Sequence, residues 1–398
     1  MKKCLSMLSI LVLAALLGML LFDKTPTSAS VSTCVETYFT KPLHHLCLLQ
    51  SSTTPLENCR PSCRIDEALL KQKLAIGLPR WARTQIKEDL AHFKNIDPSE
   101  FKIILNKNGI AKGFIQLVLF RIENGKIDVI LPEIPDHLPN RTVVLETAER
   151  QYLPIYDVLK YLAKKNYIKA TNLIFSISDF TDLTTPTTQP IFTYAKDLDN
   201  PTEKNLILFP DWMNLCTVTA TRKKIRNARE LYPWKDKKDL LFWRGGKNDS
   251  TGFRQKLVNY SHEHPNIVDA EFVQSNQAKF VDPVDHLQYK YLISIDGNRC
   301  SWERLVWHLH SNSLVFKHQT NQVQWFFKGI SPYKDYVPIL NEDDIPIQIA
   351  WANTHPKEVQ SIIKNANKFI EDNLALEDLC VYIIALLQEY QQKPISRQ

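Results

Sequence analysis

Two patterns of hydrophobic residues alternate along most of the chain and predict alternating strands and helices. Short apolar runs bounded by polar residues predict buried strands, and stretches in which apolar residues recur every three or four positions predict amphipathic helices. The predicted strands are 171–179, 190–195, 205–210, 239–245, 267–273, 289–297, 313–319 and 335–339. The predicted helices are 66–75, 83–93, 147–166, 219–232, 250–264, 302–311, 356–374 and 377–392. Strands that alternate with helices predict parallel sheets covered on both faces, which is the α/β class.

The segment 101–134 has a different pattern, in which apolar and polar residues alternate. It contains two Asn-Gly pairs, Asn108–Gly109 and Asn124–Gly125. This combination predicts antiparallel strands joined by tight turns. The strand–helix alternation forms two blocks, so we predict two Rossmann-like, doubly wound domains that face a cleft. The predicted domains are 66–232 and 233–345, followed by a helical segment at 346–398.

Composition and charge narrow the class of protein. Of the 398 residues, 44% are hydrophobic, which is typical of a globular protein and excludes a disordered one. The net charge of +6 is mild for this length. A nucleic-acid-binding protein would show a dense basic face, so we predict no nucleic-acid partner.

Residues 1–30 have the layout of an export signal. Lys2 and Lys3 precede an apolar run from Leu5 to Phe22, and small and polar residues follow. The run is at the short limit for a membrane span, so a cleaved signal peptide and an uncleaved membrane anchor both fit. Either way, we expect the rest of the chain outside the cytosol, in the lumen of the secretory pathway or the bacterial periplasm.

Residues 31–65 are crowded with cysteines and show little periodicity. In an oxidising compartment this pattern predicts a disulfide-stapled N-terminal arm. A zinc site that uses His44 and His45 is the alternative, although the ligand spacing matches no standard pattern. The cysteines of the arm are Cys34, Cys47, Cys59 and Cys63.

The stretch "LLFWRGG" ends a predicted strand in an arginine and two glycines, and a helix follows a short polar loop. Glycines at the carboxyl end of a strand let a phosphate approach the backbone, and Ser250 or Thr251 can cap the helix, whose free N–H groups attract anions. The pattern predicts a diphosphate site, although an ordinary strand-to-helix turn with a surface arginine has the same spacing. The sequence is neither a P-loop nor a Gly-x-Gly-x-x-Gly motif. The predicted site residues are Arg244, Gly245, Gly246 and Arg254.

A second stretch, "ISIDGNRCSWERL", repeats this design of strand, glycine, polar loop and helix. Gly297 permits close approach, Ser301 is a cap candidate, and Arg304 lies in the first helical turn. Two such starts in one predicted domain point to an anion site more strongly than one.

The stretches "YPWKDKKDLLFWRGG", "PNIVDAEFV", "VDHLQYKYLISIDGN" and "NSLVFKHQTNQVQWFFKGISPYKDYVPI" resemble glycosyltransferase family 90. This family comprises the fungal capsule-associated proteins, which are called CAP10-like, and the Rumi-type protein O-glucosyltransferases. The resemblance runs from about residue 172 to the C-terminal helix. It implies a GT-B-like fold with the acceptor side in 66–232 and a UDP-sugar in 233–345. It also implies that the helices of 346–398 pack back on the first domain.

The resemblance implies an inverting transfer without a metal or another cofactor. Asp179, at the end of "NLIFSISD", matches the catalytic base of the family, and Asp182 is the rival carboxylate. The donor residues implied lie around Gly246 and Arg254 and across 297–304. The intervals from Gly246 to Arg254 and from Ser301 to Arg304 are slightly longer than the corresponding intervals in the animal enzymes. The final helix resembles one whose cysteine pairs with the N-terminal region, so we expect Cys380 in a disulfide with the arm.

The function predicted is an exported glycosyltransferase that moves glucose or xylose from a UDP-sugar to a protein, polysaccharide or lipopolysaccharide hydroxyl. A non-catalytic glycan- or nucleotide-binding module on the same scaffold is the alternative. A nucleotide-dependent oxidoreductase is the third class, and the missing dinucleotide fingerprint weighs against it.

Overall fold

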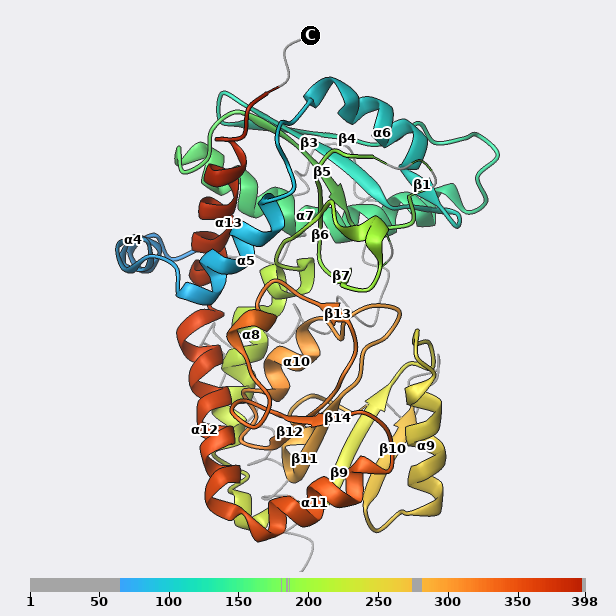
Figure 1. Ribbon diagram of the computed structural model, residues 1–398, viewed down its shortest axis with the longest axis vertical. Helices are drawn as coiled ribbons and strands as arrows, with labels where there is room; N and C mark the ends of the chain where they lie inside the picture. Colours follow the sequence, from blue (N-terminus) through green and yellow to red (C-terminus); the bar gives the residue numbers. More distant parts are fainter. Residues whose placement is uncertain (1–64, 180, 184, 186, 274–280, 396–398) are drawn as a thin grey trace, which may run out of the picture. The chain divides into compact units, whose positions relative to one another are not determined.

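The computed structural model describes residues 65–179, 181–183, 185, 187–273 and 281–395. The predicted export signal and the predicted cysteine arm lie outside the described residues. Two five-stranded sheets with flanking helices make up the described part (Figure 1). The predicted α/β class is therefore confirmed. None of the helices in the described ranges is long and apolar enough to cross a membrane.

The first sheet has the strand order β4-β3-β5-β6-β8. β5, β6 and β8 are parallel, whereas β3 is antiparallel to both of its neighbours. The prediction of a doubly wound first sheet is wrong at this edge, because a hairpin joins β3 to β4 where a Rossmann-like sheet would have a crossover helix. The strands are β3 (Leu117–Glu123), β4 (Lys126–Ile130), β5 (Thr171–Ser176), β6 (Ile191–Thr193) and β8 (Leu206–Leu208).

Part of the antiparallel segment is helical. Residues Phe101–Asn108 form α6, because Phe101, Ile104, Leu105 and Asn108 are spaced to bury one helical face. The tight turns lie at Lys112–Gly113, between β1 (Ile110–Ala111) and β2 (Phe114–Ile115), and at the predicted pair Asn124–Gly125. All four turn residues have positive φ, the geometry that a two-residue hairpin turn requires.

The second sheet is parallel throughout, with the order β10-β9-β11-β12-β14. In chain order this is 2-1-3-4-5, a doubly wound arrangement whose direction of progression reverses between β9 and β11. Each central strand is a short apolar run buried between helices; Leu241, Phe242 and Trp243 of β9 are almost completely buried. The strands are β9 (Lys238–Gly245), β10 (Val268–Phe272), β11 (Tyr289–Ser294), β12 (Leu314–His318) and β14 (Val337–Ile339).

Apart from α6, most α-helices of the described part begin within about three residues of their predicted positions. The exceptions are α7 and α8, which begin six and seven residues earlier than predicted, and α11, which lies in the predicted helical tail and had no predicted range of its own. Besides α6, the α-helices are α4 (Glu67–Ile76), α5 (Arg80–Leu90), α7 (Arg141–Lys164), α8 (Trp212–Arg229), α9 (Phe253–Glu263), α10 (Glu303–His308), α11 (Asp344–Thr354), α12 (Pro356–Asn373) and α13 (Leu376–Tyr390). A small antiparallel pair also joins β7 (Lys196–Asp197) to β13 (Gln322–Val323).

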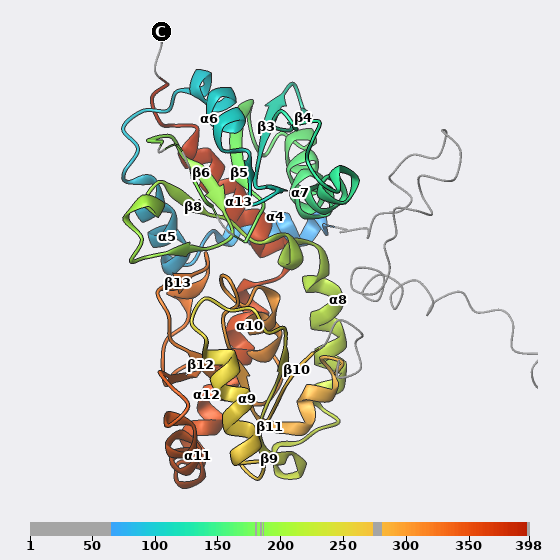
Figure 2. The ribbon, with the colours of Figure 1, turned by 90° about the vertical axis from the view of Figure 1, so that its right-hand side faces the viewer.

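Helix α13 lies beside the first sheet in both views (Figures 1 and 2). The Tyr382 hydroxyl donates to the Leu208 carbonyl at 3.2 Å, and the Tyr390 hydroxyl donates to the Asn172 carbonyl at 3.1 Å. The arm cysteines expected to pair with Cys380 lie outside the described residues, and within the described part Cys380 has no disulfide partner. Cys380 is a free thiol with 0% exposure, because its side chain faces the apolar core under α13.

Candidate functional site

Two loops meet where the second sheet reverses its strand order. The β9 loop, residues 246–252, leads to α9, and the β11 loop, residues 295–302, leads to α10. The Ser250 N–H donates to the Gly297 carbonyl at 3.0 Å and joins the two loops directly. Ligands of doubly wound sheets bind outside the carboxyl ends of the strands at such a reversal, so this is the candidate donor site.

The arginines of the two helix starts share one aromatic support. The guanidinium carbons of Arg254 and Arg304 lie 5.6 Å and 5.9 Å from the ring centroid of Trp243. A guanidinium group is attracted to the face of an indole ring, so Trp243 holds both positive charges near the end of β9. The structure thus brings together the arginines of two motifs that lie 50 residues apart in the sequence.

Two of the predicted glycines make room for these side chains rather than for a ligand. A Cβ atom added to Gly245 would lie 2.5 Å from Cζ2 of Trp243 and 3.1 Å from Nη1 of Arg304. A Cβ atom on Gly297 would lie 3.0 Å from Nη2 of Arg254. Gly246 differs, because it is exposed and, apart from its chain neighbours, no atom of the described residues lies within 4 Å of its added Cβ position. Among the three, Gly246 is the glycine that faces open space.

Arg254 uses all three of its guanidinium nitrogens to hold the two loops together. Its Nε donates to the Asp296 carbonyl at 3.1 Å and its Nη2 to the Ile295 carbonyl at 3.3 Å, both in or beside the β11 loop. Its Nη1 donates to two carbonyls of the β9 loop, those of Gly246 at 2.9 Å and Asn248 at 3.1 Å. Arg254 therefore shapes the site through the backbone.

Arg304 is the arginine of this group with an unused donor. Its Nη1 is buried and has no hydrogen-bond partner among the residues that the structure describes. Burial, and then the neighbouring charge of Arg254, lower the pKa of Arg304 to about 10. A buried guanidinium beside a second one is unfavourable unless an anion is present. The pair therefore has the chemistry of an anion site.

Arg244 does not join this pair. Successive residues of a strand point to opposite faces, so Arg244 leaves β9 on the side away from Trp243 and Gly245. Its Nη2 forms an ion pair with Oδ1 of Asp269 on β10 at 2.7 Å, and its Nη1 donates to the Asp269 carbonyl at 3.0 Å. In the structure Arg244 belongs to a strand-to-strand contact.

The helix caps differ in part from the predicted ones. Ser250 does not cap α9, whereas the Thr251 hydroxyl accepts the N–H of Phe253, the first residue of the helix, at 3.2 Å. The carboxylate of Asp249, which was not predicted as a cap, accepts the N–H groups of Thr251, Gly252 and Arg254. A carboxylate suits this place because the first N–H groups of a helix have no partner within it. The Ser301 hydroxyl pairs with that of Ser294 at 2.7 Å, and Trp302, with φ of 49°, precedes α10.

Asp179 reaches the β11 loop from the first sheet. It lies beyond the carboxyl end of β5, and its main-chain carbonyl accepts a hydrogen bond of 3.0 Å from Nε of Arg299. Burial raises the pKa of the Asp179 carboxyl, while a hydrogen bond from the Asn298 side chain and the charge of Arg299 act in the opposite direction. A carboxyl group with a raised pKa is a better proton acceptor than an ordinary aspartate.

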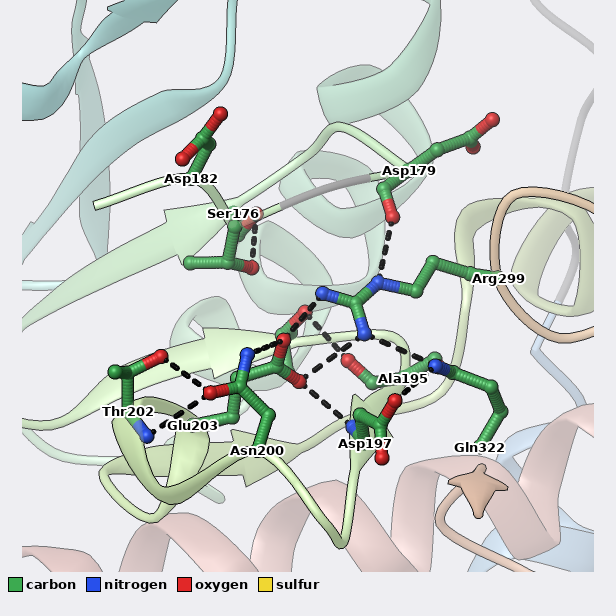
Figure 3. Close-up of polar contacts among 12 residues, drawn as sticks. Ser176, Asp179, Asp182, Ala195, Asp197, Asn200, Thr202, Glu203, Arg299 and Gln322 are labelled. Carbon is green, nitrogen blue, oxygen red and sulfur yellow. Dashed lines mark hydrogen bonds and ion pairs between the residues drawn. The ribbon is translucent and has the colours of Figure 1, made fainter. Parts of the chain in front are cut away.

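Asp182 points elsewhere. Figure 3 shows the side chains of Asp179 and Asp182 on opposite sides of the loop that carries both. The Asp182 carboxylate lies 3.3 Å from Nζ of Lys112, and both side chains of this ion pair are about half exposed. Its main chain is held by the amide of Gln116. Among the described residues, Asp182 thus has no hydrogen bond or ion pair with the β11 loop.

Asn298 and Arg299 are the residues that sequence reasoning missed. Both lie between Gly297 and Ser301, in a motif that was singled out for its glycine, serine and distal arginine. The sequence signal that could have drawn attention to them is an Asn-Arg pair directly after the glycine of a strand-end loop. The role of the pair depends on contacts with residues far away in the sequence, which no local pattern reveals. The described residues hold no cluster of three or more His, Cys, Asp or Glu side chains that could bind a metal ion.

Comparison with known proteins places this geometry in a family. The model of "Glycosyl transferase family 90" matches residues 150–394, well over half of the chain, and this range contains β5, both loops and α13. The chain belongs to glycosyltransferase family 90. The family resemblance inferred from the four sequence stretches is thereby confirmed.

Curated relatives are protein O-glucosyltransferases. Protein O-glucosyltransferase 1 of Bos taurus is 25% identical over 228 residues, which cover 50% of this chain and 56% of that protein. Protein O-glucosyltransferase 3 of Homo sapiens is 30% identical over 175 residues, which cover 41% and 34%. The chain thus matches about half the length or less of these relatives. A solved glycosyltransferase from Rickettsia africae covers 66% of this chain and 86% of its own, with 11% identity and a TM-score of 0.35.

Proposed function

We propose that this protein is an inverting, metal-independent glycosyltransferase that transfers glucose or xylose from a UDP-sugar to a hydroxyl group. The names of the relatives favour a protein acceptor, and a polysaccharide or lipopolysaccharide is the alternative. The export signal predicted for residues 1–30 favours work in the secretory lumen or the bacterial periplasm, with membrane anchoring by the same segment as an open alternative.

The observation that carries the proposal is the meeting of Asp179 with the β11 loop. This contact puts a partly desolvated carboxylate from the first sheet beside the loop whose next helix carries Arg304. An inverting transfer needs a base on the acceptor side of the sugar and positive charge on the leaving-group side. The two halves of the described chain supply one each.

The reaction follows from these two positions. The Asp179 carboxylate takes the proton of the acceptor hydroxyl while its oxygen attacks the anomeric carbon. The bond from that carbon to the β-phosphate oxygen breaks, and UDP leaves with the electron pair. The unpaired Nη1 of Arg304 stabilises the negative charge that develops on the diphosphate. Attack from the side opposite to UDP inverts the anomeric configuration.

The first prediction separates the two aspartates. Asp179→Asn keeps the size of the side chain but removes the proton acceptor, so transfer from UDP-glucose should fall about 10²- to 10⁴-fold. UDP affinity, measured by calorimetry, should stay within about twofold because the change lies on the acceptor side. Release of UDP in the presence of a panel of Ser/Thr peptides measures transfer.

Asp182→Asn is the matched control and should keep normal transfer, because Asp182 pairs with Lys112 away from the loop. If Asp182→Asn is inactive and Asp179→Asn is normal, the roles of the two carboxylates are reversed. If UDP binds but no variant and no acceptor gives turnover, the chain is a non-catalytic nucleotide- or glycan-binding module.

A further inference from the structure

Arg299 forms the densest polar contact between the β11 loop and the first half of the chain. Its side chain is buried, with 8% exposure, and uses three nitrogens in four hydrogen bonds. Nε donates to the Asp179 carbonyl at 3.0 Å. Nη1 donates to Oε2 of Glu203 and to Oε1 of Gln322, both at 3.1 Å, and Nη2 donates to Oε1 of Glu203. Figure 3 shows this fork.

The partner carboxylate is itself fixed on several sides. Glu203 is 3% exposed and accepts the Asp197 N–H at 2.7 Å and the Asn200 side-chain amide at 3.0 Å. The amide of Gln322 donates to Oδ2 of Asp197 at 2.8 Å, next to the pairing of β7 with β13. A bidentate arginine in such a frame has one orientation, because each end of its fork is bound.

Consecutive residues of the β11 loop therefore hold both parts of Asp179. Arg299 binds its main-chain carbonyl, and the side chain of Asn298 binds its carboxylate. We propose that Arg299, fixed by Glu203 and Gln322, is a positioning residue that sets the place of Asp179 relative to the donor loop. This inference rests on the proposed function, in which Asp179 is the base.

Positioning of this kind affects the rate of the chemical step more than binding. The β11 loop carries Arg299 two residues before Ser301 and five before Arg304. Arg299 thus connects the proposed base, Asp179, to the β11 loop, so that a displacement of Asp179 relative to this loop would break the hydrogen bond between them. A shift of about 1 Å in a reacting group can cost about 10²-fold in rate.

Arg299→Lys tests the geometry while it keeps the charge. Lysine can still pair with Glu203, but it lacks the fork that reaches Asp179, Glu203 and Gln322 together. We expect kcat for transfer from UDP-glucose to fall about ten- to hundredfold, with UDP affinity by calorimetry within about twofold of the wild type.

Arg229→Lys is the matched control, because Arg229 also forms a largely buried ion pair, with Glu371 at 2.9 Å, away from the loop. Its kcat should be unchanged.

Arg299→Gln adds a readout that a purely structural role would not change. Loss of the positive charge removes one influence that lowers the pKa of Asp179. Arg299 is the charged group that acts on this carboxyl, and Asn298 is the polar one. Since the base works only when deprotonated, the acid limb of the kcat/KM profile should move to higher pH in Arg299→Gln and stay in place in Arg299→Lys.

The outcomes separate this inference from the proposed function. If Asp179→Asn is inactive but Arg299→Lys has wild-type kcat, the positioning role is wrong and the proposed function stands. If Arg299→Lys loses UDP affinity as strongly as kcat, Arg299 belongs to donor binding, which also overturns the inference. If Asp179→Asn remains active, the base assignment fails and the inference fails with it. Where Arg299→Gln does not fold, Arg299→Lys and its control decide the question.

Discussion

At the scale of single residues, two arginines in equivalent positions have opposite surroundings. Arg254 and Arg304 each lie in the first turn of a helix that follows a strand of the second sheet. Arg254 donates to four carbonyls, whereas Nη1 of Arg304 is buried without a partner in the described structure. Residue type and spacing are the same, so only the fold distinguishes the arginine that holds the loops from the one available to an anion.

The contrast predicts opposite effects on stability and binding for Arg304→Met. Removal of a buried, unpaired charge should raise the free energy of unfolding of the ligand-free protein by about 1 kcal/mol. The same change should weaken UDP binding about ten- to hundredfold, because one charge-assisted contact is lost. Urea denaturation and calorimetry measure the two effects. Arg226→Met, on the exposed face of α8, is the control for both.

Arg254→Met should instead lower the unfolding free energy by several kcal/mol, because four carbonyls lose their donor. Equal effects of Arg254→Met and Arg304→Met on stability would contradict this assignment of roles.

At the scale of elements, the sequence predicted the existence of most strands and helices but not how they begin. Apolar periodicity located α9 and α10 correctly, since burial of one face decides that a helix forms. The cap of α9 was predicted only in part: Asp249, Ser250 and Thr251 are all good cap residues, and the path of the loop decides that Asp249 and Thr251 reach the first N–H groups of the helix while Ser250 does not. The sequence predicted β3 as an antiparallel strand but not that it joins the main sheet beside β5. Alternation of apolar and polar residues indicates that a strand is half-buried, but it does not indicate which strand lies next to it.

Glycines at the strand ends give a prediction at this scale. Gly245→Ala would drive a Cβ atom to 2.5 Å from the buried Trp243 ring, so the unfolding free energy should fall by about 1–3 kcal/mol. Gly246→Ala is the matched control, because, apart from its chain neighbours, no atom of the described residues lies within 4 Å of its added Cβ and its φ is not positive. Its stability should stay within about 0.5 kcal/mol of the wild type.

The control also tests the predicted role of Gly246. If Gly246→Ala is as stable as the wild type yet binds UDP less tightly, the added methyl group interferes with the ligand and the glycine faces the donor. A stability loss as large as that of Gly245→Ala would show that the described path of the β9 loop is wrong.

At the scale of the whole molecule, the contacts that make the candidate site are remote in sequence. Arg299 and Glu203 are 96 residues apart, and Arg299 and Asp179 are 120 apart. Local patterns could indicate Asp179 and the β11 loop separately, and the family resemblance could assign them to one reaction. Their actual contact depends on how two sheets pack, which no spacing along the chain encodes. The domain boundaries proposed at 232 and 345 stay predictions.

Buried histidines give the molecule a pH dependence that its site does not explain. His286, His310 and His318 are each at most 6% exposed, and burial lowers their pKa values to about 3, 4 and 4. All three come from the half of the chain that contains the second sheet. A histidine whose folded pKa lies below its unfolded value is neutral in the native state, so protons favour the unfolded chain below about pH 6.5.

His286 provides the test of this dependence. Its ring lies edge-on to Phe242 and Trp307, and its Nδ1 has no partner in the described structure. Between pH 7 and pH 5 the unfolded histidine gains its proton and the folded one does not, which costs about 2 kcal/mol of stability. His286→Leu should therefore reduce the loss of unfolding free energy over this range by about that amount.

Exposed His262→Leu is the control and should leave the loss unchanged, because an exposed ring is hydrated in both states. Urea titrations at pH 7, 6 and 5 give the slopes. Parallel slopes for the wild type and His286→Leu would mean that His286 is protonated within the fold, and that the packing described around it is wrong.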